Sequence, residues 1–434
     1  MYHFIGIKGS GMSSLAVIMK QLGYDVKGSD LEEHFFTEEE LIKNNIEMTP
    51  YDSKNITPDL KIIKGLSITD DNVELKKAKE LHLQILDYNE MVGELTKKYK
   101  TICVAGCHGK TTTTSMIAHV LDKIKGSNYL IGDGTGHADK NNQYFILESC
   151  EYKRHFLSYT PYYALVLNID LDHVDYYKDI NDIISAYQEF ANLSTKMVIA
   201  CGDDDNVRKM NLTKKISYFG LQENNDIRAI NVLYTQKGIS FDVLVNNNLY
   251  GKFNLPIYGK HQLLDALAAI SVCYYENIEA DVVEQELSSF KGAKRRFTET
   301  VAGDSIVIDD YAHHPNEIKS TINAIKQKYP NKKIISVFMP HTFSRTKEFY
   351  KEIAKELDRS DEAYIMDIFP AREKQSDFPE ITKEIIINNM KKGHPLVKED
   401  ISKLNNYKDA IFIFMSPKDI TDIEKELINL KNKK

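Results

Sequence analysis

The stretch TICVAGCHGKTTTT (residues 101–114) decides the fold class of this chain. A short apolar run predicts a buried strand, and the residues after it predict a glycine turn that opens a helix. Gly106 and Gly109 let the main chain approach an anion, which the backbone N–H groups and the helix dipole attract. Lys110 would reach the terminal phosphates of a nucleotide, and the Thr111 hydroxyl would bind Mg²⁺. The stretch therefore predicts an α/β domain built around a phosphate loop.

This loop is a shortened variant of the standard pattern. The standard pattern has a glycine five residues before Gly109, where this chain has Val104. A glycine turn with a chance Gly-Lys-Thr is the alternative interpretation. The order of strand, glycines, lysine, hydroxyl and helix favours the phosphate loop.

Length and composition limit the possible classes of protein. The chain has 434 residues, 42% of them hydrophobic and 27% charged, which predicts about three globular domains. Its net charge is −7 and its longest basic run is the short KRR at 294–296, so nucleic acid is not an expected partner. The five cysteines form no C-x-x-C pair, which favours a reducing, cytoplasmic setting. No apolar run reaches the roughly 20 residues of a spanning helix, so no membrane insertion is expected.

Alternating apolar runs and helix-like stretches predict an α/β fold of three domains, each with a parallel sheet. We expect an N-terminal Rossmann-like domain over residues 1–98 and a central P-loop ATPase domain over 99–294. The far end of the central domain is expected to contain hairpin-like strand pairs around 220–253 and an amphipathic helix at 262–274. A C-terminal Rossmann-like α/β domain follows over 295–434, because a Gly-Ala-Lys-Arg-Arg turn precedes a new set of apolar runs.

Acidic residues and a histidine follow two strands of the predicted central sheet. Glu148 ends the run YFILES, and Glu151 comes three residues later. The next run leads into NIDLDHVDY, which places Asp172, His173 and Asp175 at the same sheet edge. Carboxylates beside a triphosphate are suited to hold Mg²⁺. Imidazole suits softer metals, so a structural hydrogen bond is the alternative role for His173.

A second glycine loop lies near the N-terminus. In GIKGSGMSS (6–14), Gly9 and Gly11 follow a predicted strand and precede a predicted helix. The dinucleotide fingerprint fails at its last position, Ser14, while Asp30 ends the second strand. A diphosphate ligand is therefore expected. An NAD-dependent oxidoreductase is the alternative, and it would leave the 106–112 loop unexplained.

Taken together, the motifs resemble those of the Mur ligase family. They cover essentially the whole chain in order: HFIGIKGSGMS, AGCHGKTTTT, ESCEYKRHFLSY, NIDLDHVDYY, YGKHQLLDALAAI, KRRF, DDYAHHPNEI and PHTFSRT. The resemblance implies an ATP- and Mg²⁺-dependent ligase of peptidoglycan precursor synthesis that forms an amide bond through an acyl phosphate. It also implies UDP-N-acetylmuramate and L-alanine as substrates, and we expect a monomer or a weak homodimer.

The resemblance further implies roles for individual residues. The UDP-sugar would be held in the first domain by Gly9, Ser10, Gly11, Met12 and Asp30. ATP would be bound by Gly106, Cys107, His108, Gly109, Lys110, Thr111, Thr112, His261 and Asp265, with Arg296, Asp310 and His313 from the third domain. Metal ligands would be Thr111, Glu148 and His173, with Glu151 in reserve. Arg345 and Arg372 would bind the amino acid, and Lys110, His173 and Arg345 would act in catalysis.

Two parts of the chain depart from the family pattern. Asp265 stands where the family has asparagine, which leaves ATP or GTP open as the nucleotide, because a carboxylate only accepts hydrogen bonds. The C-terminal stretches PAREKQSDF (370–378) and FMSPKDI (414–420) also differ, so the acceptor is open. A ligase for a preformed peptide or another amino acid is one alternative, and a nucleotide-sensing protein without turnover is another.

Overall fold

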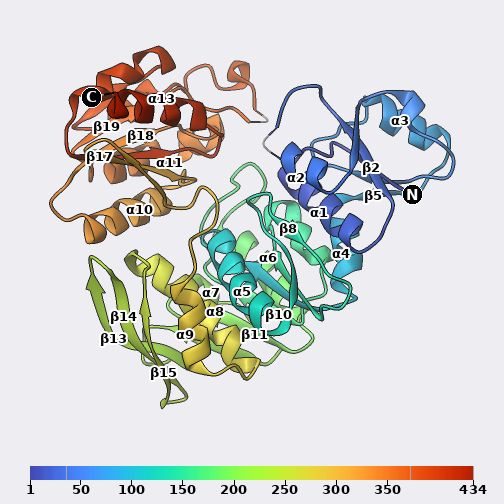
Figure 1. Cartoon of the computed structure of the whole chain (residues 1–434), viewed down its shortest axis with the longest axis horizontal. Coiled ribbons are helices and arrows are strands. Elements are labelled where there is room, and N and C mark those ends of the chain that lie inside the picture. The colour runs from blue at the N-terminus through green and yellow to red at the C-terminus, as the bar shows by residue number, and fades with distance from the viewer. Residues whose placement is uncertain (36, 372, 434) are drawn as a thin grey trace.

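The computed structural model describes residues 1–35, 37–371 and 373–433. Three sheets with helices packed on them follow one another along the chain (Figure 1). The unit coloured blue contains the N-terminus, the green and yellow unit lies in the middle, and the orange and red unit contains the C-terminus. The predicted α/β fold class is therefore confirmed.

The first sheet has five parallel strands in the order β3-β2-β1-β4-β5. Apolar side chains of β1 and β4 are buried, which explains why the sequence pattern predicted both. The edge strand β3 has no apolar run and no fully buried residue, so the pattern missed it. The elements are β1 (Tyr2–Ile5), α1 (Ser10–Gln21), β2 (Val26–Asp30), α2 (Glu38–Lys43), β3 (Glu47–Pro50), β4 (Lys61–Lys64), α3 (Val73–Glu80), β5 (Ile85–Asp87) and α4 (Tyr88–Thr96).

The central sheet has ten strands in the order β15-β14-β13-β12-β11-β10-β6-β9-β7-β8. Strands from β12 to β7 run parallel, and the hairpins β13–β15 extend one side, as the sequence predicted. The strands are β6 (Lys100–Ala105), β7 (Ser127–Leu130), β8 (Gly136–His137), β9 (Tyr144–Glu148), β10 (Tyr163–Val166), β11 (Met197–Cys201), β12 (Ile216–Gly220), β13 (Ile227–Thr235), β14 (Gly238–Val245) and β15 (Asn248–Leu255).

Two helices of this central unit, α5 (Lys110–Lys125) and α8 (Gly259–Tyr275), pack against each other. We expected an amphipathic helix at 262–274, but all residues from Ala266 to Cys273 are buried. Neighbouring helices and strands cover α8 on more than one face, which removes the polar face of a surface helix. The remaining helices of the unit are α6 (Ile180–Asn192), α7 (Asp205–Arg208) and α9 (Ala280–Ser288).

The third sheet has six strands in the order β16-β17-β21-β18-β19-β20, with β16 antiparallel and the others parallel. The elements are β16 (Thr298–Ala302), β17 (Ser305–Asp310), α10 (Pro315–Lys328), β18 (Lys333–Phe338), α11 (Phe343–Leu357), β19 (Glu362–Ile365), α12 (Glu384–Ile387), β20 (Gly393–Pro395), β21 (Ala410–Met415) and α13 (Thr421–Asn432). Across the described residues, no helix has the length and apolarity to cross a membrane.

Helix α10 joins the third unit to the central one, since it packs against α8. The Gln327 side chain of α10 accepts a hydrogen bond from the Gly259 main chain at 2.8 Å. Its amide group donates to the Thr235 carbonyl at 3.0 Å. This docking brings the N-terminal end of α10 against the loops that follow β6 and β10.

Candidate active site

The phosphate loop connects β6 to α5, as predicted. Gly109 precedes the helix in the left-handed region at φ 83°, which disfavours any residue with a side chain. A Cβ atom here would also lie 2.4 Å from an Asp265 carboxylate oxygen. A Cβ atom at Gly106 would lie 2.9 Å from the Leu167 side chain. Both glycines are therefore required by the close packing around this loop.

Lys110 lies across this loop. Its ammonium group donates to the Gly106 carbonyl at 2.6 Å and to the two Glu151 carboxylate oxygens at 3.0 and 2.9 Å. Burial alone would lower the pKa of Lys110, but the negative charge of Glu151 raises it above its ordinary value. Burial works in the opposite direction on Glu151, and Lys110 nevertheless keeps the Glu151 pKa below its usual range. Lys110 is therefore a fixed cation beside the loop.

The residues proposed as metal ligands form two neighbouring groups. The Thr111 hydroxyl donates to a Glu148 carboxylate oxygen at 2.9 Å. His173 Nε2 lies 3.6 Å from Oε1 of Glu151, the alternative metal ligand, so these two side chains face each other. Hydroxyl and carboxylate oxygens are the donors Mg²⁺ prefers, and the Thr111–Glu148 pair fits such an ion at the start of α5.

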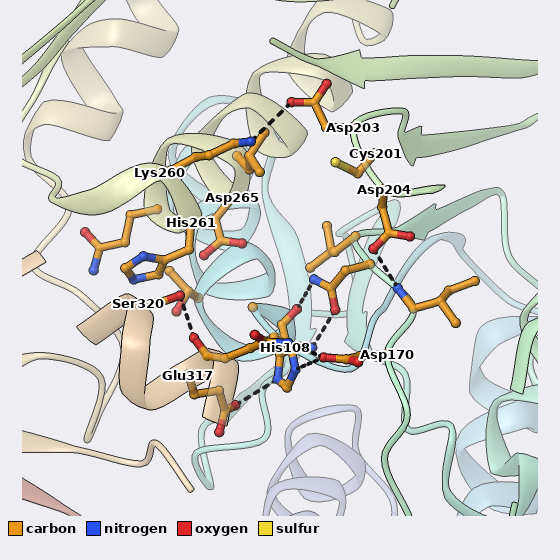
Figure 2. Close-up of a pocket in the computed structure, with 18 of the residues that line it drawn as sticks. His108, Asp170, Cys201, Asp203, Asp204, Lys260, His261, Asp265, Glu317 and Ser320 are labelled. Carbon is orange, nitrogen blue, oxygen red and sulfur yellow. Dashed lines mark hydrogen bonds and ion pairs between the residues drawn. The ribbon is translucent and has the colours of Figure 1, made fainter. Parts of the chain in front are cut away.

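A cavity of about 480 Å³ opens beside the loop (Figure 2). Asp265 is buried at its inner wall, where it accepts a hydrogen bond from the Thr113 hydroxyl at 3.2 Å, and burial raises the pKa of Asp265 to about 7. Burial lowers the pKa of His261 to about 4, so this imidazole is neutral at pH 7. The lining also includes Lys260, whose ammonium lies 3.8 Å from an Asp203 oxygen. The cavity has the polar and apolar surfaces that a nucleotide requires.

The third unit contributes a cation to the phosphate loop. Arg296 donates to the Thr111 hydroxyl at 3.4 Å and lies over the Tyr311 ring at 4.9 Å. Asp310 lines the same cavity and accepts from the main-chain N–H groups of Phe297 and Ala312 at 2.9 Å each. Burial raises the pKa of Asp310 to about 6. Arg296 thus lies at the phosphate loop.

Arg345 crosses between the central and third units at a second point. Its guanidinium is hydrogen-bonded to the Asp172 carboxylate and to His341 Nδ1 at 2.6 Å. The ring of His313 packs edge-on against His341, with centroids 5.3 Å apart. Asp172, His173, His341 and Arg345 line one small cavity, so the structure brings two of the proposed catalytic residues together. Arg372, the other expected amino-acid ligand, lies outside the described residues.

The N-terminal glycine loop has a different environment. Gly9 precedes α1, and Asp30 accepts a hydrogen bond from the Lys8 main chain at 2.7 Å. Gly11 lies under the Tyr88 ring, which a Cβ atom would meet at 2.9 Å. Met12 is buried in the core, so only its main chain is available to a ligand. Ser10, the first residue of α1, is partly exposed.

Asp170 and Glu317 are not among the predicted site residues, yet both contact His108 of the phosphate loop. His108 Nε2 lies 3.3 Å from Asp170 Oδ2, and His108 Nδ1 lies 3.2 Å from Glu317 Oε1 (Figure 2). The only sequence signal was their place inside the motifs NIDLDHVDYY and DDYAHHPNEI. Which carboxylate in such a motif meets the loop depends on how the units dock.

A phosphate loop in a central α/β unit, with charged side chains reaching it from a further α/β unit, defines a nucleotide-dependent enzyme of several domains. Three family models match the chain. They are the Mur ligase family catalytic domain over residues 1–100, the Mur ligase middle domain over 104–273 and the Mur ligase glutamate ligase domain over 295–417. The chain belongs to the Mur ligase family, as its motifs predicted, and is an ATP-dependent amide-forming ligase.

Individual relatives agree with this assignment. A UDP-N-acetylmuramate–L-alanine ligase of Lactiplantibacillus plantarum is 44% identical over 425 residues, which cover 98% of this chain and 97% of that protein. The crystal structure of UDP-N-acetylmuramate-alanine ligase from Thermotoga maritima is similar with a TM-score of 0.82 and 25% identity, over 99% of this chain and 98% of that one. A murein peptide ligase from Psychrobacter arcticus shares the fold with a TM-score of 0.74 and 22% identity, over 100% of this chain and 99% of that one.

Proposed function

We propose that this enzyme joins L-alanine to the carboxylate of UDP-N-acetylmuramate, with conversion of ATP to ADP and phosphate, in peptidoglycan precursor synthesis. The observation that carries the proposal is the meeting of Lys110, Thr111 and Glu148 at one loop with Arg296 from the third unit. The 44% identical relative of that name supports the choice of substrates. The peptide ligase alternative is not favoured, because the 44% identical relative, which matches 98% of this chain, is a UDP-N-acetylmuramate–L-alanine ligase.

The reaction needs an activated carboxylate, because a carboxylate is a poor electrophile. The terminal phosphoryl group of ATP passes to the sugar carboxylate and gives an acyl phosphate. The amine of L-alanine then attacks the acyl carbon, and phosphate leaves. Lys110 and Arg296 stabilise the negative charge that spreads over the transferring phosphoryl oxygens.

Mg²⁺ would be held by Thr111 and Glu148, with His173 as the ligand on the acceptor side, and when bound it would neutralise phosphate charge. Glu151 keeps the Lys110 ammonium in place, so we assign it as a positioning residue instead of a metal ligand. His261 would face the nucleotide base, and Asp265 would support the phosphate loop from below, at Thr113 and Gly109.

For the amino acid we propose the small cavity between the central and third units. Arg345 would pair with the L-alanine carboxylate, since a guanidinium binds a carboxylate in bidentate fashion. The narrow space at Asp172 and His341 favours a small side chain. Arg372 remains a predicted second ligand for the same carboxylate.

The UDP-sugar would bind at the N-terminus of α1 through residues 9–12, with Asp30 holding the loop. We propose domain limits of 1–98, 99–294 and 295–434, for the UDP-sugar, ATP and amino-acid domains. The expectation of a monomer or weak homodimer stays a prediction, which sedimentation velocity at several protein concentrations would test.

Phosphate release is the experiment that tests this function. ATP and Mg²⁺ are supplied with UDP-N-acetylmuramate and L-alanine, separately and together, and with glycine, L-serine or a tripeptide as rival acceptors. We expect release only when both named substrates are present. Release with the tripeptide in place of L-alanine would identify a peptide ligase, and release stimulated by neither acceptor would contradict the proposal.

A further inference from the structure

His108 of the phosphate loop lies between carboxylates from two different units (Figure 2). Asp170, in the loop after β10, faces His108 Nε2 at 3.3 Å. Glu317, in the first turn of α10 in the third unit, faces His108 Nδ1 at 3.2 Å. A carboxylate oxygen therefore lies within ion-pair distance of each ring nitrogen, with a hydrogen bond at Nε2, and two such negative neighbours favour the doubly protonated imidazolium.

The third unit encloses this imidazolium on further sides. The His314 ring packs beside the His108 ring with centroids 4.8 Å apart. The Asn316 amide donates to Asp170, so the third unit also contacts the carboxylate that faces His108 Nε2. The His108 side chain is only 18% exposed as a result.

The electrostatics agree with a charged His108. Burial alone would lower the pKa of His108, but Asp170 and Glu317 raise it to about 10. Burial would raise the pKa of Glu317, and the neighbouring His313, His108 and Arg296 instead hold it well below its usual range. One positive charge thus lies between two negative ones in a site with little solvent.

The main chain of His108 is part of the nucleotide-binding loop. Its N–H donates to the Asn168 side-chain oxygen at 2.8 Å, and its carbonyl accepts from the Asn168 amide at 2.9 Å. The loop is therefore fixed on one side by Asn168 through the main chain. On the other side the His108 ring contacts Asp170 of its own unit and Glu317 of the third unit.

We infer that Glu317 is a positioning residue that couples docking of the third unit to nucleotide affinity, by fixing the phosphate loop through the His108 imidazolium. The inference rests on the proposed use of residues 106–112 to bind ATP. Docking of the third unit strengthens ATP binding, and by linkage ATP binding favours docking of the third unit by the same factor.

Glu317 also caps α10, so the test must separate its charge from its capping role. Its Oε2 accepts from the main-chain N–H groups of His313 and His314 at 3.0 and 3.2 Å. The Glu317→Gln variant keeps an acceptor oxygen for the cap and removes only the charge. The His108→Gln variant removes the imidazolium, which is the other partner of this ion pair. The two single variants and the double variant complete a double-mutant cycle.

The readout is the dissociation constant of the protein for a non-hydrolysable ATP analogue in the presence of Mg²⁺. It is measured calorimetrically on the full chain without other substrates. We expect each single variant to weaken binding about tenfold, and the double variant to weaken it by no more than about tenfold. The KM for ATP should rise in parallel, while the KM for L-alanine stays constant. Glu299→Gln is the matched control, because Glu299 pairs with Lys328 away from the loop.

Two results would overturn the inference. The first is a double variant whose nucleotide binding is weakened about a hundredfold, which is the product of the two single effects. The second is unchanged nucleotide binding in Glu317→Gln. A wild-type enzyme that binds the analogue but does not ligate L-alanine would contradict the proposed function. The nucleotide affinities of the double-mutant cycle would still test the inference. Thermal unfolding of every variant checks that the fold is kept, and a loss of stability in Glu317→Gln with unchanged affinity counts against the inference.

Discussion

The two glycine loops of this chain have the same local design and different surroundings. Each joins the end of a parallel strand to a helix, and each has a lysine within or beside the turn. Lys110 lies across its own loop, between the Gly106 carbonyl and Glu151. Lys8 points away from its loop, to the carbonyls of Leu31 and Glu33 at 2.7 and 2.8 Å.

This difference shows that a glycine turn at a helix N-terminus provides an anion site but does not decide which chemistry occurs there. At the phosphate loop, Thr111 and Glu148 add oxygen donors for a metal and Arg296 adds a cation from another unit. At the N-terminal loop the lysine is used to hold the local chain. The first arrangement suits phosphoryl transfer, and the second suits binding of a diphosphate without reaction.

The largest effect should come from Lys110→Met. Loss of the cation at the transferring phosphoryl group should lower phosphate release by about 10³-fold. UDP-sugar binding should be unchanged in calorimetry, because the two loops lie on different sheets. Lys8→Met is the matched comparison and should weaken UDP-sugar binding while ATP binding stays normal. Loss of both ligands in either variant would contradict the separate roles of the loops.

A second large effect is expected at the proposed metal site. Glu148→Gln replaces a charged oxygen ligand by a neutral amide, so kcat should fall about 10²-fold and the Mg²⁺ concentration for half-maximal rate should rise. Removal of Mg²⁺ with a chelator should abolish turnover in the wild type and leave UDP-sugar binding intact. An unchanged Mg²⁺ dependence in Glu148→Gln would place the metal elsewhere.

Alanine substitutions compare the two loops directly. Gly109→Ala combines a positive φ with a Cβ atom 2.4 Å from Asp265, and we expect ATP binding to weaken by about tenfold or more. In Gly11→Ala the new Cβ atom would lie 2.9 Å from the Tyr88 ring, which can shift, and the φ angle of Gly11 is not positive. We expect a smaller loss, confined to UDP-sugar binding. Equal losses would show that the loops have similar constraints.

A separate effect concerns the stability of the central unit. Burial raises the pKa of Asp265 in the folded protein to about 7. A carboxyl group with such a raised pKa lowers the free energy of unfolding as the pH increases from about 4 to 7. Asp265→Asn should therefore increase the free energy of unfolding at pH 8 by about 4 kcal/mol and change it little at pH 4. Denaturant unfolding at the two pH values measures this. A gain of the same size at both values would exclude titration of Asp265 as the cause.

Asp265→Asn also tests the choice of nucleotide. Because Asp265 is hydrogen-bonded to Thr113 and packs under Gly109, we expect the variant to keep the preference for ATP over GTP. The ratio of kcat/KM for the two nucleotides is the measurement. A change in that ratio would place the carboxylate against the base.

Several elements could be predicted from the sequence because their signals are local. The apolar run and glycines at 101–109 require a strand and a tight turn whatever surrounds them. The hairpins β13–β15 and the strands of the third sheet are also local patterns. The edge strand β3 was missed and α8 was expected to be amphipathic, because burial of each depends on neighbours distant in the chain.

The sequence by itself determined the α/β class, the phosphate loop and the family, because strand and helix periods, turn glycines and short motifs are contained within a few consecutive residues. Only the tertiary structure decided which charges meet. Glu317 faces His108, Arg345 faces Asp172 and Lys110 faces Glu151, and the residues of each pair are at least 41 positions apart in sequence. Electrostatic energy depends on distance in space and on exclusion of water, and both are set by how the units pack.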